Sequence, residues 1–179
     1  MTDRPQKALT VHDPWADAIV YGDKRIENRT WTPYSGSLGN RILIHTAKAW
    51  DEEHAERAAG LEYMGLHAYD EDRAARGHII GSVRVVGYIH EQYTEREHEL
   101  VVDYINDQFP AGVYLADALR SLLHGLLNDP WWQGPVGWIL DDPVAYETPV
   151  AARGQQRIWT PDDDALKRCW AQEDNHADI

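Results

Sequence analysis

A chain of 179 residues with 17 Lys and Arg against 30 Asp and Glu carries a formal net charge of −13. A protein this acidic does not coat DNA or an anionic bilayer by bulk attraction, because such binding needs positive potential and the release of counterions by Lys and Arg. Its 43% hydrophobic and 26% charged residues also exclude a disordered chain and are typical of one globular domain.

The chain begins with a predicted strand and a short helix. Lys7–His12 is short and β-rich. Asp13 and Pro14 follow it. Asp at the N-cap with Pro at the first helical position predicts a helix start, and Gly22 predicts the end of that helix.

Two more strands are predicted before residue 47. Between Lys24 and Trp31 the residue types alternate, and a period of two places one set of side chains on a single face: Arg25, Glu27, Arg29 and Trp31. Turn residues between Tyr34 and Gly39 separate this strand from the next, which is predicted over Arg41–Thr46.

The middle of the chain predicts one long strand among helices. Trp50–Leu66 is typical of a solvated helix with acidic residues at its N-terminal end. Gly77–His90 is the longest strand signal, and its interior glycines, Gly81 and Gly87, indicate a bulge or bend. Helical spacing of apolar residues over 94–107 and 111–127 predicts a helical insertion at about 91–133.

Strands resume after this insertion and a helix ends the chain. The strands are predicted at Val136–Leu140, Val144–Thr148 and Gln155–Thr160, and the helix at about 162–173. The whole chain, 1–179, is predicted to be one α+β domain, a small mixed-strand β-barrel with flanking helices. A doubly wound parallel sheet is the weaker alternative, because no glycine-rich strand-to-helix turn is present.

Positive charge is concentrated in one segment. Between Gly22 and Lys48 five basic side chains face two acidic ones, a local charge of +3 in a chain of −13. Lysine and arginine donate to phosphates and base carbonyls, a carboxylate accepts from a base amine, and an indole stacks on an unpaired base. Lys24, Glu27 and Arg29 with Trp15 or Trp31 therefore predict a nucleobase-sized pocket, whereas the structural alternative is an ordinary Glu27–Arg29 ion pair.

Several motifs in order along the chain carry a resemblance to a known family. They are Pro14-Trp15, the Gly-x-Lys-x-x-Glu-x-Arg pattern over Gly22–Arg29, Ile42–Lys48, Ile80–Val86, Gly137–Leu140 and Arg153–Trp159. Together they resemble the ASCH domain of the PUA-like superfamily, from about Ala8 to Trp159 with a break at 91–133. The resemblance implies a PUA-like β-barrel of five or six strands with flanking helices, and a role in RNA binding or processing.

The resemblance also implies a set of site residues. The implied cleft holds Lys24, Glu27 and Arg29, with Trp15 beside it and, more loosely, Ser82 and Trp138 from later strands. Some ASCH proteins resemble amidohydrolases of acetylated cytidine, in which Lys and Thr lie three residues apart. Here the residue three after Lys24 is Glu27, so the hydroxyl nucleophile is missing and that activity is not transferred.

Three hypotheses for the function remain open. The first is a module that binds single-stranded RNA or a modified nucleotide or nucleoside in the cleft of Lys24, Glu27, Arg29 and Trp15. The second is a hydrolase of the same cleft, a metal-independent ribonuclease or a modified-nucleoside amidohydrolase, with Lys24 and Glu27 as its catalytic residues. The third is an adaptor whose insertion at 91–133 meets a protein partner.

Other residue patterns predict no further chemistry. The nine histidines are dispersed without ligand spacing, so we expect no metal and no cofactor. The single Cys169 is predicted to be a packed thiol. The Trp131-Trp132 pair is predicted to hold a loop against the barrel, and the alternative is that it stacks on a base at the edge of the cleft. With no apolar run long enough to span a bilayer and no intrachain disulfide possible, we expect a cytoplasmic protein without a membrane partner.

Overall fold

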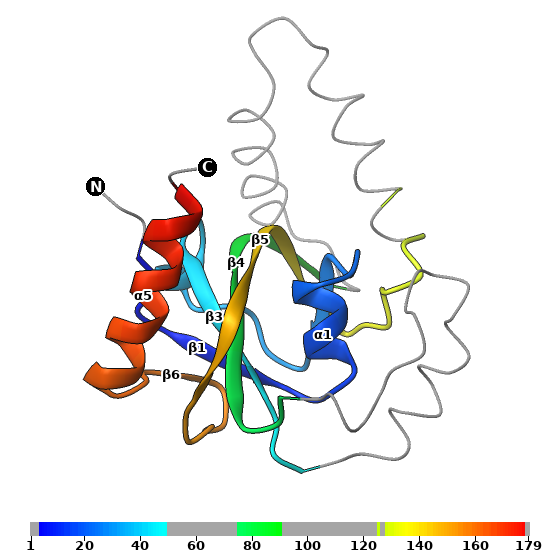
Figure 1. Cartoon of the computed structure of the whole chain (residues 1–179). Helices are drawn as coiled ribbons and strands as arrows, with labels where there is room; N and C mark the ends of the chain where they lie inside the picture. Colours follow the sequence, from blue (N-terminus) through cyan, green and yellow to red (C-terminus); the bar gives the residue numbers. More distant parts are fainter. Residues whose placement is uncertain (1–3, 50–74, 91–124, 126–127, 178–179) are drawn as a thin grey trace, which may run out of the picture. The chain divides into compact units, whose positions relative to one another are not determined.

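The computed structural model describes residues 4–49, 75–90, 125 and 128–177 (Figure 1). In chain order the elements are β1 (Ala8–Val11), α1 (Trp15–Val20), β2 (Ile26–Arg29), the 3-10 helix η1 (Ser35–Ser37), β3 (Arg41–Thr46), β4 (His78–His90), β5 (Val136–Ala151), β6 (Ile158–Trp159) and α5 (Asp163–Ala177). The predicted helix at Trp50–Leu66 and the predicted helices at 94–107 and 111–127 lie outside the described residues.

The strands form one mixed sheet in the order β2-β5-β4-β3-β1-β6. β1 pairs with β3 in parallel and with β6 antiparallel. The pairs β2 with β5 and β3 with β4 are antiparallel. A mixed sheet accompanied by helices is an α+β fold, so the predicted fold class is confirmed.

The chain divides into two compact units. The first unit contains residues 1–24, 41–84 and 142–179, and the second contains residues 25–40 and 85–141. Each unit is described by itself below.

The core of the first unit packs α5 onto the sheet. Its buried residues come from β1, β3, β4, β5, β6 and α5 and include Leu43, Ile79, Tyr146, Trp159 and Cys169. The backbone N–H of Ala165 donates to Asp162 Oδ1 at 2.8 Å, which caps the first turn of the helix. The prediction that Asp162 to Asp164 open a terminal helix is therefore confirmed, and the helix extends to Ala177.

The predicted cap of the first helix is wrong. Pro14, not Asp13, occupies the N-cap position, and no side chain makes a capping hydrogen bond. Asp13 is only 3% exposed, so its carboxylate is packed inside the first unit instead of standing over the helix end. Two backbone N–H groups at this helix end, those of Trp15 and Ala16, donate to the carbonyl of His12.

The two strands predicted at Val136–Leu140 and Val144–Thr148 are one strand, β5. The Asp141-Asp142-Pro143 sequence resembles a turn, but here it bends the strand without ending it, with Asp142 in the left-handed region at φ 51°. Asp142 is held there by Arg41, which donates from Nη2 to its backbone carbonyl at 2.7 Å and forms an ion pair with its carboxylate at 2.5 Å. A charged tertiary contact outweighs the local turn preference.

The expected irregularity near Gly81 is present. The pairing of β3 with β4 shifts register between Ile44 and His45, next to Gly81. A β-carbon at Gly81 would collide with the carbonyl of Val144 and lie 2.8 Å from the Val20 side chain. Only glycine fits there, because the neighbouring backbone approaches too closely for any side chain.

Candidate functional site

Four of the predicted site residues meet in the second unit. In the β2–β5 register Glu27 lies opposite Trp138 and Arg29 opposite Val136. Residues two apart on a strand and residues directly opposite on its partner share a face of the sheet. Glu27, Arg29 and Trp138, with Trp31 against Trp138, therefore form one surface, which we call the β2–β5 face.

The charged part of the β2–β5 face is an ion pair. Arg29 Nη2 lies 2.9 Å from Glu27 Oε1, and the Glu27 and Arg29 side chains are 8% and 21% exposed. A pair this far from bulk water is less screened than a surface pair, and its donors and acceptors hold fixed directions. The predicted same-face arrangement of the two residues is confirmed.

The aromatic part of the face is a pair of indoles at right angles. The ring centroids of Trp31 and Trp138 are 4.7 Å apart with an interplanar angle of 87°. Trp138 Nε1 donates to the carbonyl of Trp31 at 3.0 Å. Trp138 is fully buried and Trp31 is half-buried, so Trp31 is the indole of this pair with surface available for stacking.

The opposite face of β2 anchors the loop that carries the second pair of tryptophans. Asn28 Nδ2 donates to the carbonyl of Trp131 at 2.8 Å, and the N–H of Gln133 donates back to Asn28 Oδ1 at 2.9 Å. Trp131 is 4% exposed. The prediction that this tryptophan pair fixes a loop is confirmed for Trp131.

The remaining predicted site residues belong to the first unit. Trp15 is half-buried at the start of α1. Lys24 is 3% exposed, and its backbone N–H donates to the carbonyl of Ala18 at 3.1 Å. Ser82 is fully buried in β4. That Trp15, Lys24 and Ser82 contact a ligand together with the β2–β5 face stays a prediction.

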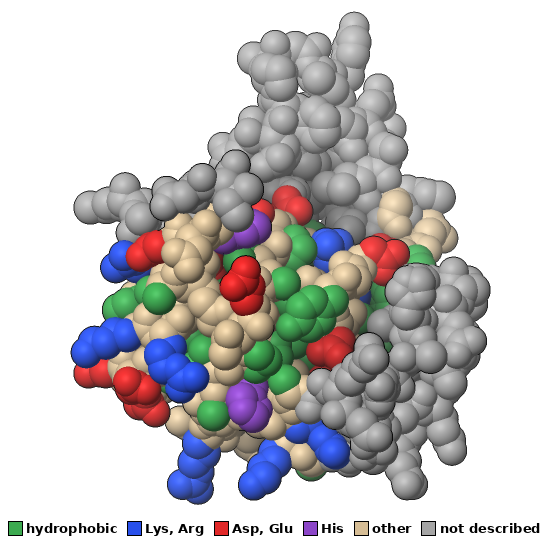
Figure 2. All heavy atoms as spheres, viewed as in Figure 1, with side chains coloured by type: hydrophobic (Ala, Val, Ile, Leu, Met, Phe, Trp, Pro, Cys, Tyr) green, Lys and Arg blue, Asp and Glu red, His purple; other side chains and the backbone are tan. Residues whose placement is uncertain are grey.

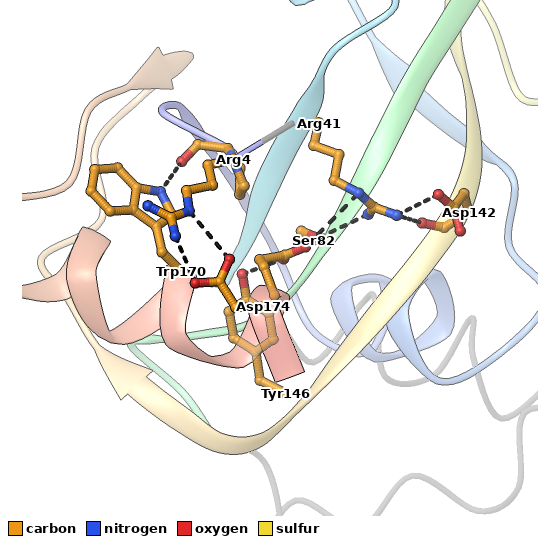
Figure 3. Close-up of polar contacts among 9 residues, drawn as sticks. Arg4, Arg41, Ser82, Asp142, Tyr146, Trp170 and Asp174 are labelled. Atoms are coloured by element: carbon orange, nitrogen blue, oxygen red, sulfur yellow. Dashed lines mark hydrogen bonds and ion pairs between the residues drawn. The ribbon is translucent and has the colours of Figure 1, made fainter. Parts of the chain in front are cut away.

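Ser82 belongs to a buried polar network that the sequence did not indicate (Figure 3). Arg41 donates from Nη1 to Ser82 Oγ at 2.9 Å, and its side chain is 7% exposed. Tyr146 donates from its hydroxyl to Glu173 Oε1 at 2.6 Å. Burial, and then the nearby Glu173 carboxylate, raise the pKa of Tyr146, so its hydroxyl stays protonated as the donor.

Cys169 packs beside this network. It is fully buried, and burial together with the charge of Glu173 raises the pKa of its thiol to about 12. A thiol that stays protonated is a poor nucleophile. The prediction of a packed Cys169 is confirmed.

Asp17 has a carboxyl with an unusual pKa that the sequence did not indicate. Burial, followed by the charge of Asp13, raises the pKa of Asp17 from 3.8 to about 7. Asp13 and Asp17 flank Trp15 in the sequence, and their spacing of four residues was the available signal. A carboxyl that titrates near neutrality can carry a proton to or from a reacting group.

Among residues 4–49, 75–90, 125 and 128–177 no three His, Cys, Asp or Glu side chains are grouped to hold a metal ion. The expected absence of a metal and of a cofactor stays a prediction. Within the same residues, no helix has the length and apolar character needed to cross a bilayer.

Comparison with known proteins identifies the family. The model described as "ASCH domain" matches residues 9–120. The crystal structure of ASCH from Zymomonas mobilis is 14% identical, with a TM-score of 0.47, and the match covers 94% of this chain and 95% of that one. A serine-to-alanine variant of that protein is also 14% identical, with a TM-score of 0.46, over 96% of this chain and 98% of that one. No curated protein matches the chain in sequence.

Proposed function

Because the chain belongs to the ASCH domain family, which is often linked to RNA binding, we propose that it binds single-stranded RNA or a single modified nucleotide. The proposed site is the β2–β5 face of the second unit, and the contribution of Trp15, Lys24 and Ser82 of the first unit stays a prediction. The observation that carries the proposal is the convergence of a carboxylate, a guanidinium and two indoles on the β2–β5 face.

These side chains suit the recognition of a base better than of a phosphate chain. A carboxylate such as Glu27 accepts from the exocyclic amine of a base, and a guanidinium such as Arg29 donates in a planar fork. The half-buried Trp31 offers the apolar surface on which an unpaired base stacks. The ion pair is neutral as a whole, so the face adds little long-range attraction and favours selectivity over affinity.

A titration of short labelled single-stranded RNA tests this proposal. We expect Arg29→Gln and Trp31→Ala each to weaken binding about tenfold, because each removes a direct contact to the base. Lys24→Met, which keeps the volume of the buried side chain but removes its charge, is expected to weaken binding as well. Arg168→Gln on the exposed side of α5 is the control and leaves affinity unchanged.

The unfolding transition of each variant is measured in parallel, so that a loss of folded protein is not taken for a loss of contact. Equal affinity of the wild-type protein and of folded Arg29→Gln, Trp31→Ala and Lys24→Met would contradict the proposal.

A second candidate function is hydrolysis of RNA or of a modified nucleoside. The observation that favours it is the half-buried Asp17 on α1, next to Ala18, whose carbonyl accepts from the backbone N–H of Lys24. Burial, followed by the charge of Asp13, raises the pKa of Asp17 to about 7, which suits a general acid or base at neutral pH. Lys24 and Glu27 are the predicted catalytic residues of this alternative. Its test is incubation with RNA and with acetylated nucleosides in the presence of a chelator.

Turnover that Glu27→Gln abolishes, with a pH–rate inflection near 7 that Asp17→Asn removes, would support hydrolysis. Absence of turnover over the whole pH range would contradict hydrolysis and leave RNA binding as the only proposed function.

A further inference from the structure

The first unit contains a cavity that none of the predicted site residues lines. Its volume is about 930 Å³, and its walls come from the end of β3, the start of β4 and the chain that follows β5. A volume of this size accommodates a nucleotide. We call it the basic pocket.

Positive charge predominates at the basic pocket. Lys48, Arg76 and Arg153 line it, and Asp162 is the one acidic residue among its lining residues. Lys48 and Arg153 are exposed, so their charged ends reach water at the rim. In Figure 2, Lys and Arg side chains and a histidine gather at the lower part of the view, where Figure 1 draws the connection between β5 and β6.

The single carboxylate at the pocket is already engaged. Asp162 Oδ1 accepts from the N–H of Ala165 at the N-terminus of α5, where the helix dipole stabilises negative charge. Three basic residues against this one carboxylate leave a net positive charge among the lining residues of the pocket. In a chain with a net charge of −13 this surplus is local.

The loop that carries Arg153 passes unusually close to a buried histidine. A β-carbon at Gly154 would collide with the ring of His45 and lie 2.8 Å from its Nδ1 atom. Only glycine lets the backbone lie this close to the imidazole. The backbone on both sides of Arg153 therefore lies against His45, at Gly154 by close approach and at Ala152 through its carbonyl.

His45 is in turn held in one orientation. Its Nε2 lies 3.1 Å from the carbonyl oxygen of Ala152, and its ring packs edge-on against Trp159 with centroids 5.4 Å apart. Burial lowers the pKa of His45, and the backbone of Ala152 and of Gly77 only partly oppose this effect. His45 therefore lines the pocket as an uncharged imidazole at neutral pH. Its Nε2–H donates to the carbonyl oxygen of Ala152.

We propose that the basic pocket binds a phosphate group, that of a nucleotide or of an RNA backbone, through Lys48, Arg76 and Arg153. Lysine and arginine are the side chains that bind phosphate most often, and exposed cations replace its counterions. The choice of a nucleotide over other phosphates rests on the proposed function. The pocket itself is argued from the first unit alone.

Binding is measured by calorimetry with adenosine 5′-monophosphate, adenosine and inorganic phosphate as probes. We expect the monophosphate to bind and adenosine to bind at least about tenfold more weakly, because the nucleoside lacks the charged group. Arg153→Gln and Lys48→Gln each weaken binding of the monophosphate, and Arg168→Gln is the matched control on α5. Binding of inorganic phosphate that the same variants weaken distinguishes recognition of phosphate alone from recognition of a nucleotide.

Equal binding of the monophosphate and adenosine, or equal binding by Arg153→Gln and Arg168→Gln, would overturn the inference. Titration with single-stranded RNA separates it from the proposed function. If Arg29→Gln weakens RNA binding and Arg153→Gln and Lys48→Gln do not, the β2–β5 face stands and an RNA role of the pocket is lost. If only the pocket variants matter, the phosphate site stands and the proposed function fails.

Discussion

The β2–β5 face and the basic pocket use charge in opposite ways. On the face, Arg29 is paired with Glu27 at 2.9 Å, so the charges are matched within the protein. At the pocket three basic residues accompany one carboxylate that a helix end engages. Matched charges with fixed directions select among bases, whereas surplus exposed cations attract any phosphate. Under the two proposals, a chain with a net charge of −13 binds a polyanion through a local surplus of positive charge.

The largest expected effect concerns the aromatic support of the face. We expect Trp138→Ala to lower the free energy of unfolding by about 3 to 5 kcal/mol, because it empties a buried site and removes the bond to the Trp31 carbonyl. Urea unfolding followed by circular dichroism measures this loss. Trp31→Ala, at a half-buried position, is expected to cost clearly less; an equal cost for both would mean that the face is not built on Trp138.

The next effect tests whether burial makes the Glu27–Arg29 ion pair contribute more to stability than an exposed ion pair does. We expect Glu27→Gln to destabilise the protein by about 2 kcal/mol, because it leaves the Arg29 guanidinium without this carboxylate in a largely water-excluded place. The exposed pair of Arg4 and Asp174, with side chains 42% and 43% exposed, provides the comparison. Asp174→Asn is expected to cost about 0 to 1 kcal/mol.

A double-mutant cycle isolates the pair itself. The combined Glu27→Gln and Arg29→Gln variant should lose less stability than the two single losses added together, since each single variant leaves one charge behind. Additive losses would show that the two side chains do not interact in solution.

A smaller effect comes from the carboxyl of Asp17 in the first unit. Its pKa rises from 3.8 in the unfolded chain to about 7 in the folded protein, so folding favours the protonated form. The stability that Asp17 contributes is therefore present below pH 3.8 and is lost as the pH rises through 7. At pH 8 the free energy of unfolding of Asp17→Asn should exceed that of the wild type by about 1 to 2 kcal/mol, a figure reduced because Asp17 is partly exposed.

Unfolding measured from pH 4 to pH 8 checks this prediction, with the exposed Asp23→Asn as the control. If the Asp17→Asn and wild-type curves run parallel over that range, the Asp17 carboxyl has no raised pKa.

The β2–β5 face shows how far the sequence alone can lead. Alternation from Lys24 to Trp31 predicted that Glu27 and Arg29 share a face, because a strand repeats every two residues and both partners lie on one element. The strand itself is shorter than predicted, Ile26–Arg29, since pairing with β5 limits it. Local periodicity thus locates side chains within an element.

The basic pocket shows where such reasoning stops. Lys48, Arg76 and Arg153 come from three distant parts of the chain, and no periodic pattern connects them. The same holds for Arg41 and Asp142, whose contact turns two predicted strands into one. The signal for the pocket was Gly154 in the Arg153–Trp159 motif, because a glycine among large polar residues indicates a close backbone approach.

The smallest expected effect separates the face from the pocket most directly. The dependence of RNA affinity on salt counts the phosphates that Lys and Arg neutralise, and removal of one such contact reduces the log–log slope by about one. We expect Arg153→Gln to reduce this slope and to weaken all RNA sequences alike. Arg29→Gln should leave the slope nearly unchanged and alter the preference among bases, because the proposal assigns Arg29 to a base and not to a phosphate. Titrations of poly-uridine and poly-adenine oligonucleotides at several salt concentrations provide both readouts, and the reverse assignment would exchange the roles of the two regions.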